Sequence, residues 1–129
     1  MDIIKLISGF ENVIVSCGAT DEEILKAEKR LNLVFAEEYK SYLQKFSYTI
    51  IDSHEITGIC SGKRLDVVKV TEEERSFNSF VPSNLYVIEQ THIDSIVVWQ
   101  NEKGEIFQSY PNGNITKIFD SLSDYLINS

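Results

Sequence analysis

Residues 95–110 read SIVVWQNEKGEIFQSY, and this stretch predicts a β-hairpin. Runs rich in β-branched and aromatic residues lie at 95–99 and 105–110, which is the composition of strands. Residues 100–104 connect them, and Gly104 can take the positive φ that a tight connection requires. Strands joined this closely pair antiparallel, so we expect the C-terminal half to be built on an antiparallel sheet.

Further strands flank the hairpin on both sides. Residues 85–88 (LYVI) precede it, and residues 115–119 (ITKIF) follow a turn at 111–114. Consecutive strands separated by short turns predict a four-stranded antiparallel meander. Two shorter β-rich pieces are expected earlier in the chain, at 49–51 and 54–59.

Amphipathic helices are predicted before and around these strands. Apolar residues at 3, 7, 10 and 14 recur at the spacing of one helical face. A second helix begins with a capping box, in which Thr20 accepts from the Glu23 amide while the Glu23 side chain reaches back. The predicted helices cover residues 3–14, 20–33, 37–46, 66–80 and 121–127.

This order of elements indicates an α+β fold, with N-terminal helices packed on an antiparallel β-sheet and a short C-terminal helix. We expect one domain over residues 1–129, because this length is typical of a single core. Within the helix at 66–80, the side that carries Val67, Val70 and Phe77 is expected to face the core.

The N-terminus lacks the basic region of a signal peptide, and no apolar run approaches the roughly 20 residues of a membrane span. We therefore expect a cytoplasmic protein that does not bind membranes. Cys17 and Cys60 fit a reducing compartment, and without a Cys-x-x-Cys spacing they indicate packing rather than zinc binding.

The formal net charge is −8, from 20 acidic and 12 basic residues. This field repels phosphate backbones, so direct nucleic-acid binding is disfavoured, whereas a basic protein would be attracted. The acidic run Glu72, Glu73 and Glu74 is a candidate steering element for such a partner. The alternative is that these acids only solvate a helix and keep the protein soluble.

Residues 52–60 read DSHEITGIC and place Asp52, His54, Glu55 and Cys60 close together. Side chains alternate between the faces of a strand, so His54 would share a side with Asp52 and oppose Glu55. A catalytic or metal site needs its groups to converge on one point, so neither is predicted. No nucleophile elbow or phosphate-binding loop occurs elsewhere, and we expect no cofactor and no enzyme activity. Asp52 and Glu55 remain candidates for partner contact, or for plain solvated surface.

Aromatic residues on the predicted sheet could lie in the core or anchor a partner. We expect Trp99 and Phe107 in the core. Tyr86 and Tyr110 are left open as partner-binding candidates, because their hydroxyls tolerate a wet rim.

Six stretches follow one another in a specific order: ATDEEI at 19–24, EKRLNL at 28–33, EEYKSYL at 37–43, HEITGI at 54–59, VPSNLYVI at 81–88 and FDSLSDYL at 119–126. As an ordered set, they resemble the SUKH superfamily of Smi/Knr-like immunity proteins, over about the whole chain. Two dipeptides depart from the usual pattern of the superfamily: Phe35-Ala36 stands where a Leu-Pro is usual, and Phe46-Ser47 where an Asn-Gly is usual.

The resemblance implies a non-catalytic binding protein. Bacterial members neutralise polymorphic toxins, many of them nucleases, by direct contact, and within the group the motifs are most similar to a Bacillus immunity protein. Eukaryotic relatives act as scaffolds. We therefore expect an immunity protein that binds a cognate protein toxin, with a scaffold or regulatory interaction module as the alternative.

Overall fold

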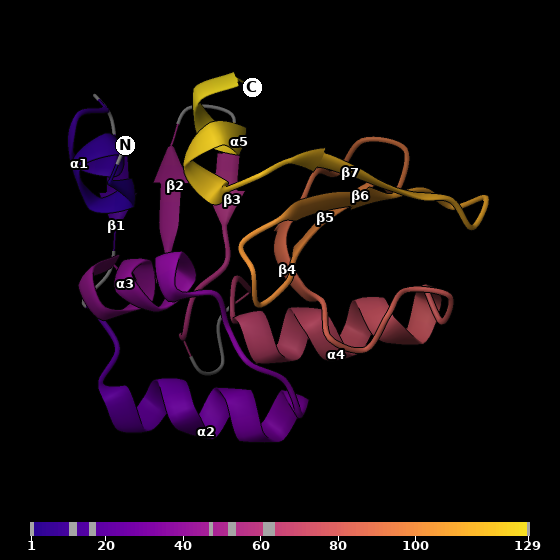
Figure 1. Cartoon of the computed structure of the whole chain (residues 1–129), viewed down its shortest axis with the longest axis horizontal. Helices are drawn as coiled ribbons and strands as arrows, with labels where there is room; N and C mark the ends of the chain where they lie inside the picture. Colours follow the sequence, from indigo (N-terminus) through magenta and orange to yellow (C-terminus); the bar gives the residue numbers. More distant parts are fainter. Residues whose placement is uncertain are drawn as a thin grey trace.

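The computed structural model describes residues 2–10, 13–15, 18–46, 48–51, 54–60 and 64–128. Helices and strands are mixed in the first half of the chain, and four consecutive strands follow α4, as Figure 1 shows. In chain order they are α1 (Ile3–Ser8), β1 (Val13–Val15), α2 (Asp21–Leu31), α3 (Glu37–Phe46), β2 (Thr49–Ile51), β3 (His54–Ile56), α4 (Val67–Phe77), β4 (Tyr86–Gln90), β5 (Val97–Gln100), β6 (Ile106–Ser109), β7 (Ile115–Phe119) and α5 (Leu122–Asn128).

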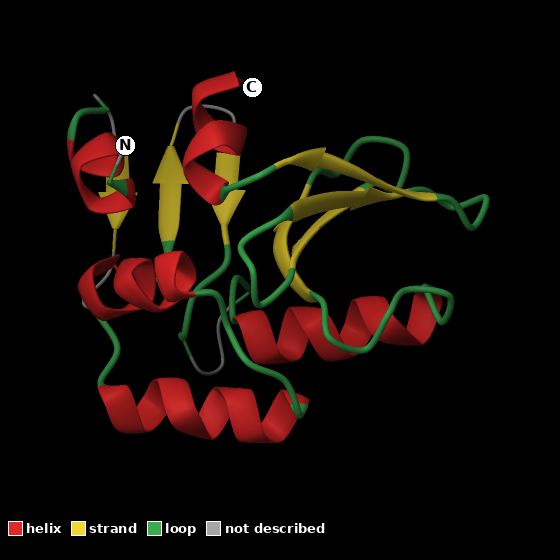
Figure 2. Ribbon diagram, viewed as in Figure 1, coloured by secondary structure: helices red, strands yellow, loops and turns green. Residues whose placement is uncertain are grey.

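The strands form two antiparallel sheets rather than one. The first contains β1, β2 and β3, and the second is the predicted meander in the order β4, β5, β6 and β7 (Figure 2). In the predicted hairpin, Trp99 lies opposite Phe107, and Gly104 takes a φ of 91° in the connection. The α+β class and the antiparallel meander are thereby confirmed.

Thr57 joins the two sheets where β3 ends. Its amide donates to the carbonyl of Ile88 at 2.9 Å, and its hydroxyl donates to the carbonyl of Val87 at 2.7 Å. Since Thr57 is buried, these bonds satisfy groups that water cannot reach. The edge of the four-stranded sheet is thus tied to the three-stranded one.

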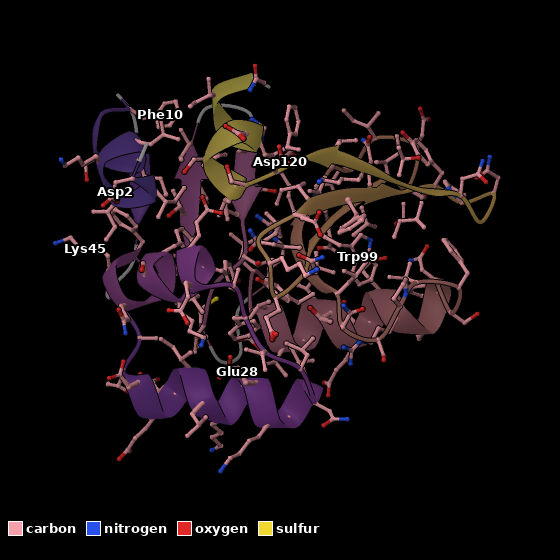
Figure 3. The ribbon with its side chains drawn as sticks, viewed as in Figure 1. Asp2, Phe10, Glu28, Lys45, Trp99 and Asp120 are labelled. Carbon is pink, nitrogen blue, oxygen red and sulfur yellow. The ribbon has the colours of Figure 1, made fainter. Side chains whose placement is uncertain are left out.

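Two hydrophobic cores lie on opposite faces of the four-stranded sheet, because alternate residues of β4 and β5 belong to different cores. The larger contains the aromatic side chains of Phe35, Tyr39, Tyr42 and Tyr86 in edge-to-face, tilted and stacked contacts. The smaller is closed by α4, which runs along the four-stranded sheet, and Trp99 lies between the two (Figures 1 and 3). Its buried members are Val70, Val81, Leu85, Val87, Val97 and Trp99.

Side-chain caps begin three of the described helices, and the cap predicted for α2 is confirmed. Thr20 and Glu23 form the predicted reciprocal capping box at α2. Asp66 caps α4, and the Ser121 hydroxyl accepts from the Asp124 amide at 3.0 Å to begin α5. A carboxylate from α3 strengthens the α5 cap, because Glu38 accepts from the amides of Leu122 and Ser123 at 2.7 and 3.1 Å.

The helix predicted over residues 3–14 is wrong in its second half. It ends at Ser8, and residues 13–15 form β1, with Val13 opposite Ile51 of β2. Three consecutive β-branched residues favour a strand once a partner strand is present. A partner that lies 38 positions away along the chain is outside any local pattern.

Candidate protein-binding surface

A groove of about 750 Å³ lies between the second half of α4, the β4–β5 connection and the β6–β7 turn. It is lined by Glu74, Phe77, Asn78, Gln90, His92, Asp94, Ser95, Ile96, Val97 and Pro111. We call this feature the α4 groove. It brings together residues from three separate parts of the sequence.

Phe77 lies on the wall of the α4 groove with 82% of its surface exposed, although the helical pattern places it with the buried Val70. The prediction of a core position is therefore wrong. Helical periodicity identifies a face but not how far the opposing sheet extends. Here α4 continues for two turns beyond Val70, and its last residue lies over a groove instead of over packed side chains.

Glu74 is the predicted steering residue that lines the groove. Its carboxylate accepts from the side-chain amide of Gln90 at 2.6 Å and from that of Asn78 at 3.2 Å. Both donors are neutral, so they hold the carboxylate in place without cancelling its charge. Asp94 adds a second carboxylate, and the described residues that line the groove include no lysine or arginine.

The β4–β5 connection has an unusual backbone. His92, Asp94 and Ser95 adopt φ values of 60°, 52° and 58°, which are uncommon for residues other than glycine. Thr91 holds this shape, because its hydroxyl donates to the Ile96 carbonyl at 2.8 Å and accepts from the Ile93 amide at 3.2 Å. The loop presents Ile93 to solvent with 63% exposure.

Glu55 lies near the groove and is engaged within the protein. Its carboxylate accepts from Arg64 through both oxygens, and the distance from His92 Nε2 to Glu55 Oε1 is 3.6 Å. The hydrogen bond and charge of Arg64 lower the pKa of the Glu55 carboxyl. Glu55 therefore links β3 to the β4–β5 loop, and its charge is largely balanced by Arg64.

The other predicted partner-binding residues are scattered. Glu72 pairs with Arg30 at 3.2 Å, and Glu73 is exposed with no cation near its carboxylate in the part of the chain that the structure describes. Tyr110 is half-buried, donates to Gln108 Oε1 at 3.1 Å and immediately precedes the groove residue Pro111. Asp52 lies outside the described residues.

Tyr86 was a candidate for partner contact, but it is fully buried. Its hydroxyl accepts from the Ala36 amide at 2.9 Å and donates to Gln100 Oε1 at 2.8 Å. Ala36 supplies an N–H for this bond that a proline at this position would lack. Burial raises the pKa of Tyr86.

A buried polar cluster around Glu89 is the feature that the sequence patterns missed. The Glu89 carboxylate accepts from the Glu55 amide at 2.7 Å and from the Tyr125 hydroxyl at 2.5 Å, and it lies 2.8 Å from His54 Nδ1. Only 4% of Glu89 is exposed. A carboxylate can only accept, so Nδ1 carries the proton in this arrangement. The sequence feature that could have indicated this cluster is the position of Glu89, directly after the apolar run LYVI at 85–88.

This cluster holds the sheets and α5 together.

Within the described ranges, no group of three or more His, Cys, Asp or Glu side chains is placed to hold a metal ion. Cys60 is half-buried, whereas Cys17 lies outside the described residues. None of the helices in the described part of the chain has the length and hydropathy to cross a bilayer.

Comparisons with known proteins give the family of this chain and a solved structure with the same fold. A family model described as SMI1-KNR4 cell-wall (SUKH_5) matches residues 3–129. A crystal structure described as a protein from Pseudomonas syringae pv. tomato is 19% identical, with a TM-score of 0.75 over 98% of this chain and 93% of that chain. At this identity the likeness shows the fold alone, and no curated protein matches the chain. The chain belongs to the SMI1-KNR4 family of the SUKH superfamily.

Proposed function

We propose that this protein is an immunity protein, which binds a cognate toxin and neutralises it by direct contact. The observation that carries the proposal is the family match over residues 3–129, since proteins of this superfamily work through protein–protein interaction. The α4 groove supports it, because it combines exposed apolar side chains with carboxylates that lack a basic partner among the described residues. Such mixtures are typical of interaction surfaces.

A nuclease domain is the toxin class that the charge favours. A nuclease must attract phosphate and therefore carries a positive cleft, and a protein with a net charge of −8 is attracted to the same cleft. In this proposal the immunity protein occupies or covers the cleft and does no chemistry of its own. It needs no cofactor, and it acts in the cytoplasm, where a nuclease would meet its substrate.

Co-expression tests the proposal. The toxin gene encoded beside this gene is induced in a sensitive host, with and without this protein, and survival is counted. Rescue by the wild-type chain is expected, together with 1:1 binding that weakens as the salt concentration rises. If the chain rescues cells from none of the neighbouring toxins, the immunity function is refuted.

A scaffold or regulatory module is the second candidate. The same exposed side chains would serve it, and a gene without a toxin neighbour would favour it. The narrower similarity to a Bacillus immunity protein, and the assignment of residues 1–129 as one domain, stay predictions.

A further inference from the structure

We propose that the α4 groove is the face that contacts the toxin, and that its occupant is a basic segment that carries an apolar side chain beside a lysine or arginine. This inference rests on the proposed immunity function. It adds the location of the interface and the chemistry of the partner segment.

The apolar part of the argument is the distribution of exposed large side chains. Three of them belong to segments that line or border the groove: Phe77 is 82% exposed, Ile93 is 63% exposed and Phe80 is 38% exposed. Phe77 and Phe80 lie at the end of α4 and just after it, and Ile93 lies between the lining residues His92 and Asp94. Aromatic side chains that become buried against a partner are frequent binding hot spots.

The carboxylates of the groove favour a positively charged partner segment. Glu74 and Asp94 line the groove, and neither has a lysine or arginine partner among the described residues. The carboxylate of Glu74 is already oriented by Gln90 and Asn78, so a cation could bind it without reorganisation. A lysine or arginine stem could then pack on Phe77 while its charge meets the carboxylates.

The β4–β5 loop is held in its conformation by internal hydrogen bonds. Three residues with positive φ are held by hydrogen bonds from Thr91, and the Ile96 amide donates to the Ile93 carbonyl at 3.0 Å. Because the loop is already ordered, binding does not have to supply the cost of ordering it.

A rival surface exists around α2, where Leu25 and Val34 are 51% and 47% exposed. Two shallow depressions there are lined by Lys29 and Lys40 as well as by acidic residues, and Lys40 pairs with Glu28 at 3.8 Å. Charges of both signs make this surface a poorer complement to a basic segment. It therefore serves as the matched control.

The test measures the affinity and the association rate of the toxin domain encoded beside this gene, at low and high salt. Phe77→Ala removes the apolar anchor, and Leu25→Ala removes a large exposed apolar side chain from the rival surface. The double variant Glu74→Gln with Asp94→Asn removes two negative charges from the groove while keeping side-chain shape. Glu102→Lys changes the net charge equally at an exposed turn at the opposite end of β5.

We expect Phe77→Ala to weaken binding about tenfold or more, as truncation of an aromatic hot spot does. The double variant should slow association at low salt by several-fold, and the difference should shrink at high salt. The two controls should stay within about twofold of wild type. Melting temperatures should change little, because the other substituted side chains are exposed and glutamine at 74 keeps an acceptor oxygen for Gln90 or Asn78. Normal binding by the groove variants, or a loss with Leu25→Ala alone, would overturn the inference.

A second arm separates this inference from the immunity proposal. A ¹⁵N-labelled sample is titrated with a short synthetic peptide of lysine and leucine, and with one of glutamate and leucine as control. Shifts confined to the amides of residues 74–78 and 91–97 with the basic peptide support the groove, even if the wild-type chain fails to bind the neighbouring toxin. In that case only the immunity function falls. Shifts elsewhere, or none, would refute the groove.

Discussion

Replacing Glu89 by alanine should destabilise the protein more than any surface change. This carboxylate is 4% exposed and receives hydrogen bonds from the Glu55 amide and the Tyr125 hydroxyl, with His54 Nδ1 at 2.8 Å. These groups come from β3 and α5, while Glu89 belongs to β4. The alanine variant would leave three polar groups without their acceptor at the junction of the two sheets.

The expected cost in unfolding free energy is about 3–5 kcal/mol, because three buried polar groups lose the same carboxylate acceptor and each unsatisfied buried group costs about 1–3 kcal/mol. A simple sum over three bonds to a carboxylate, at about 1.5–3 kcal/mol each, would give more. That sum overstates the loss, because the carboxylate regains its hydration in the unfolded chain. Glu89→Gln keeps the volume and one acceptor oxygen, so we expect about 1–2 kcal/mol for it.

Urea denaturation followed by tryptophan fluorescence measures these values. Trp99 is the single tryptophan, it is fully buried, and its indole Nε1 donates to Ser109 Oγ at 2.9 Å, so its emission reports the packing of the four-stranded sheet. Glu102→Ala is the control, with an expected change within about 0.5 kcal/mol. If Glu89→Ala cost less than about 1 kcal/mol, the claim that this carboxylate binds the sheets together would be refuted.

Three further predictions concern the buried tyrosines and the close backbone approach at Gly18. Burial raises the pKa of four tyrosines, so above pH ~10 the unfolded chain loses protons that the folded one keeps, and stability should fall by about 1.4 kcal/mol per pH unit per tyrosine. They are Tyr39, Tyr42, Tyr86 and Tyr125. Absorbance at 295 nm should show them ionising only on unfolding, and ionisation with the fold intact would contradict this. Tyr86→Phe should lower the free energy of unfolding in urea by about 1–3 kcal/mol, because Ala36 N–H and Gln100 Oε1 lose their buried partner. An unchanged urea midpoint would show that water replaces the hydroxyl. Gly18→Ala should lower the melting temperature strongly, since a Cβ at 18 would lie 1.8 Å from the Gln44 carbonyl oxygen, and a normal melting curve would show that the α3 backbone can move.

The elements that could be predicted from the sequence are those that local chemistry specifies. The hairpin at 95–110 follows from its β-rich runs and Gly104, and the start of α2 follows from Thr20 and Glu23. These signals act over a few residues, so no tertiary contact is needed to recognise them. The acid excess is likewise a property of composition, and it supports the proposed class of partner.

Contacts between distant residues determined the rest. The strand at Val13–Val15 needs β2, and the length of the sheet under α4 decides that Phe77 faces the groove instead of the core. The strand pattern at 85–88 likewise does not show that the Tyr86 hydroxyl is satisfied inside the core, by Ala36 and Gln100.

The candidate surface shows the same division. Charge singled out Glu74, but only the fold places it beside Asp94 and Phe77, and only the fold shows that Arg30 and Arg64 engage Glu72 and Glu55. A sequence determines which groups are charged or apolar, because these are properties of single side chains. Whether a given group is free to meet a partner depends on which neighbours the folded chain brings within a few ångströms, and tertiary structure alone decides that.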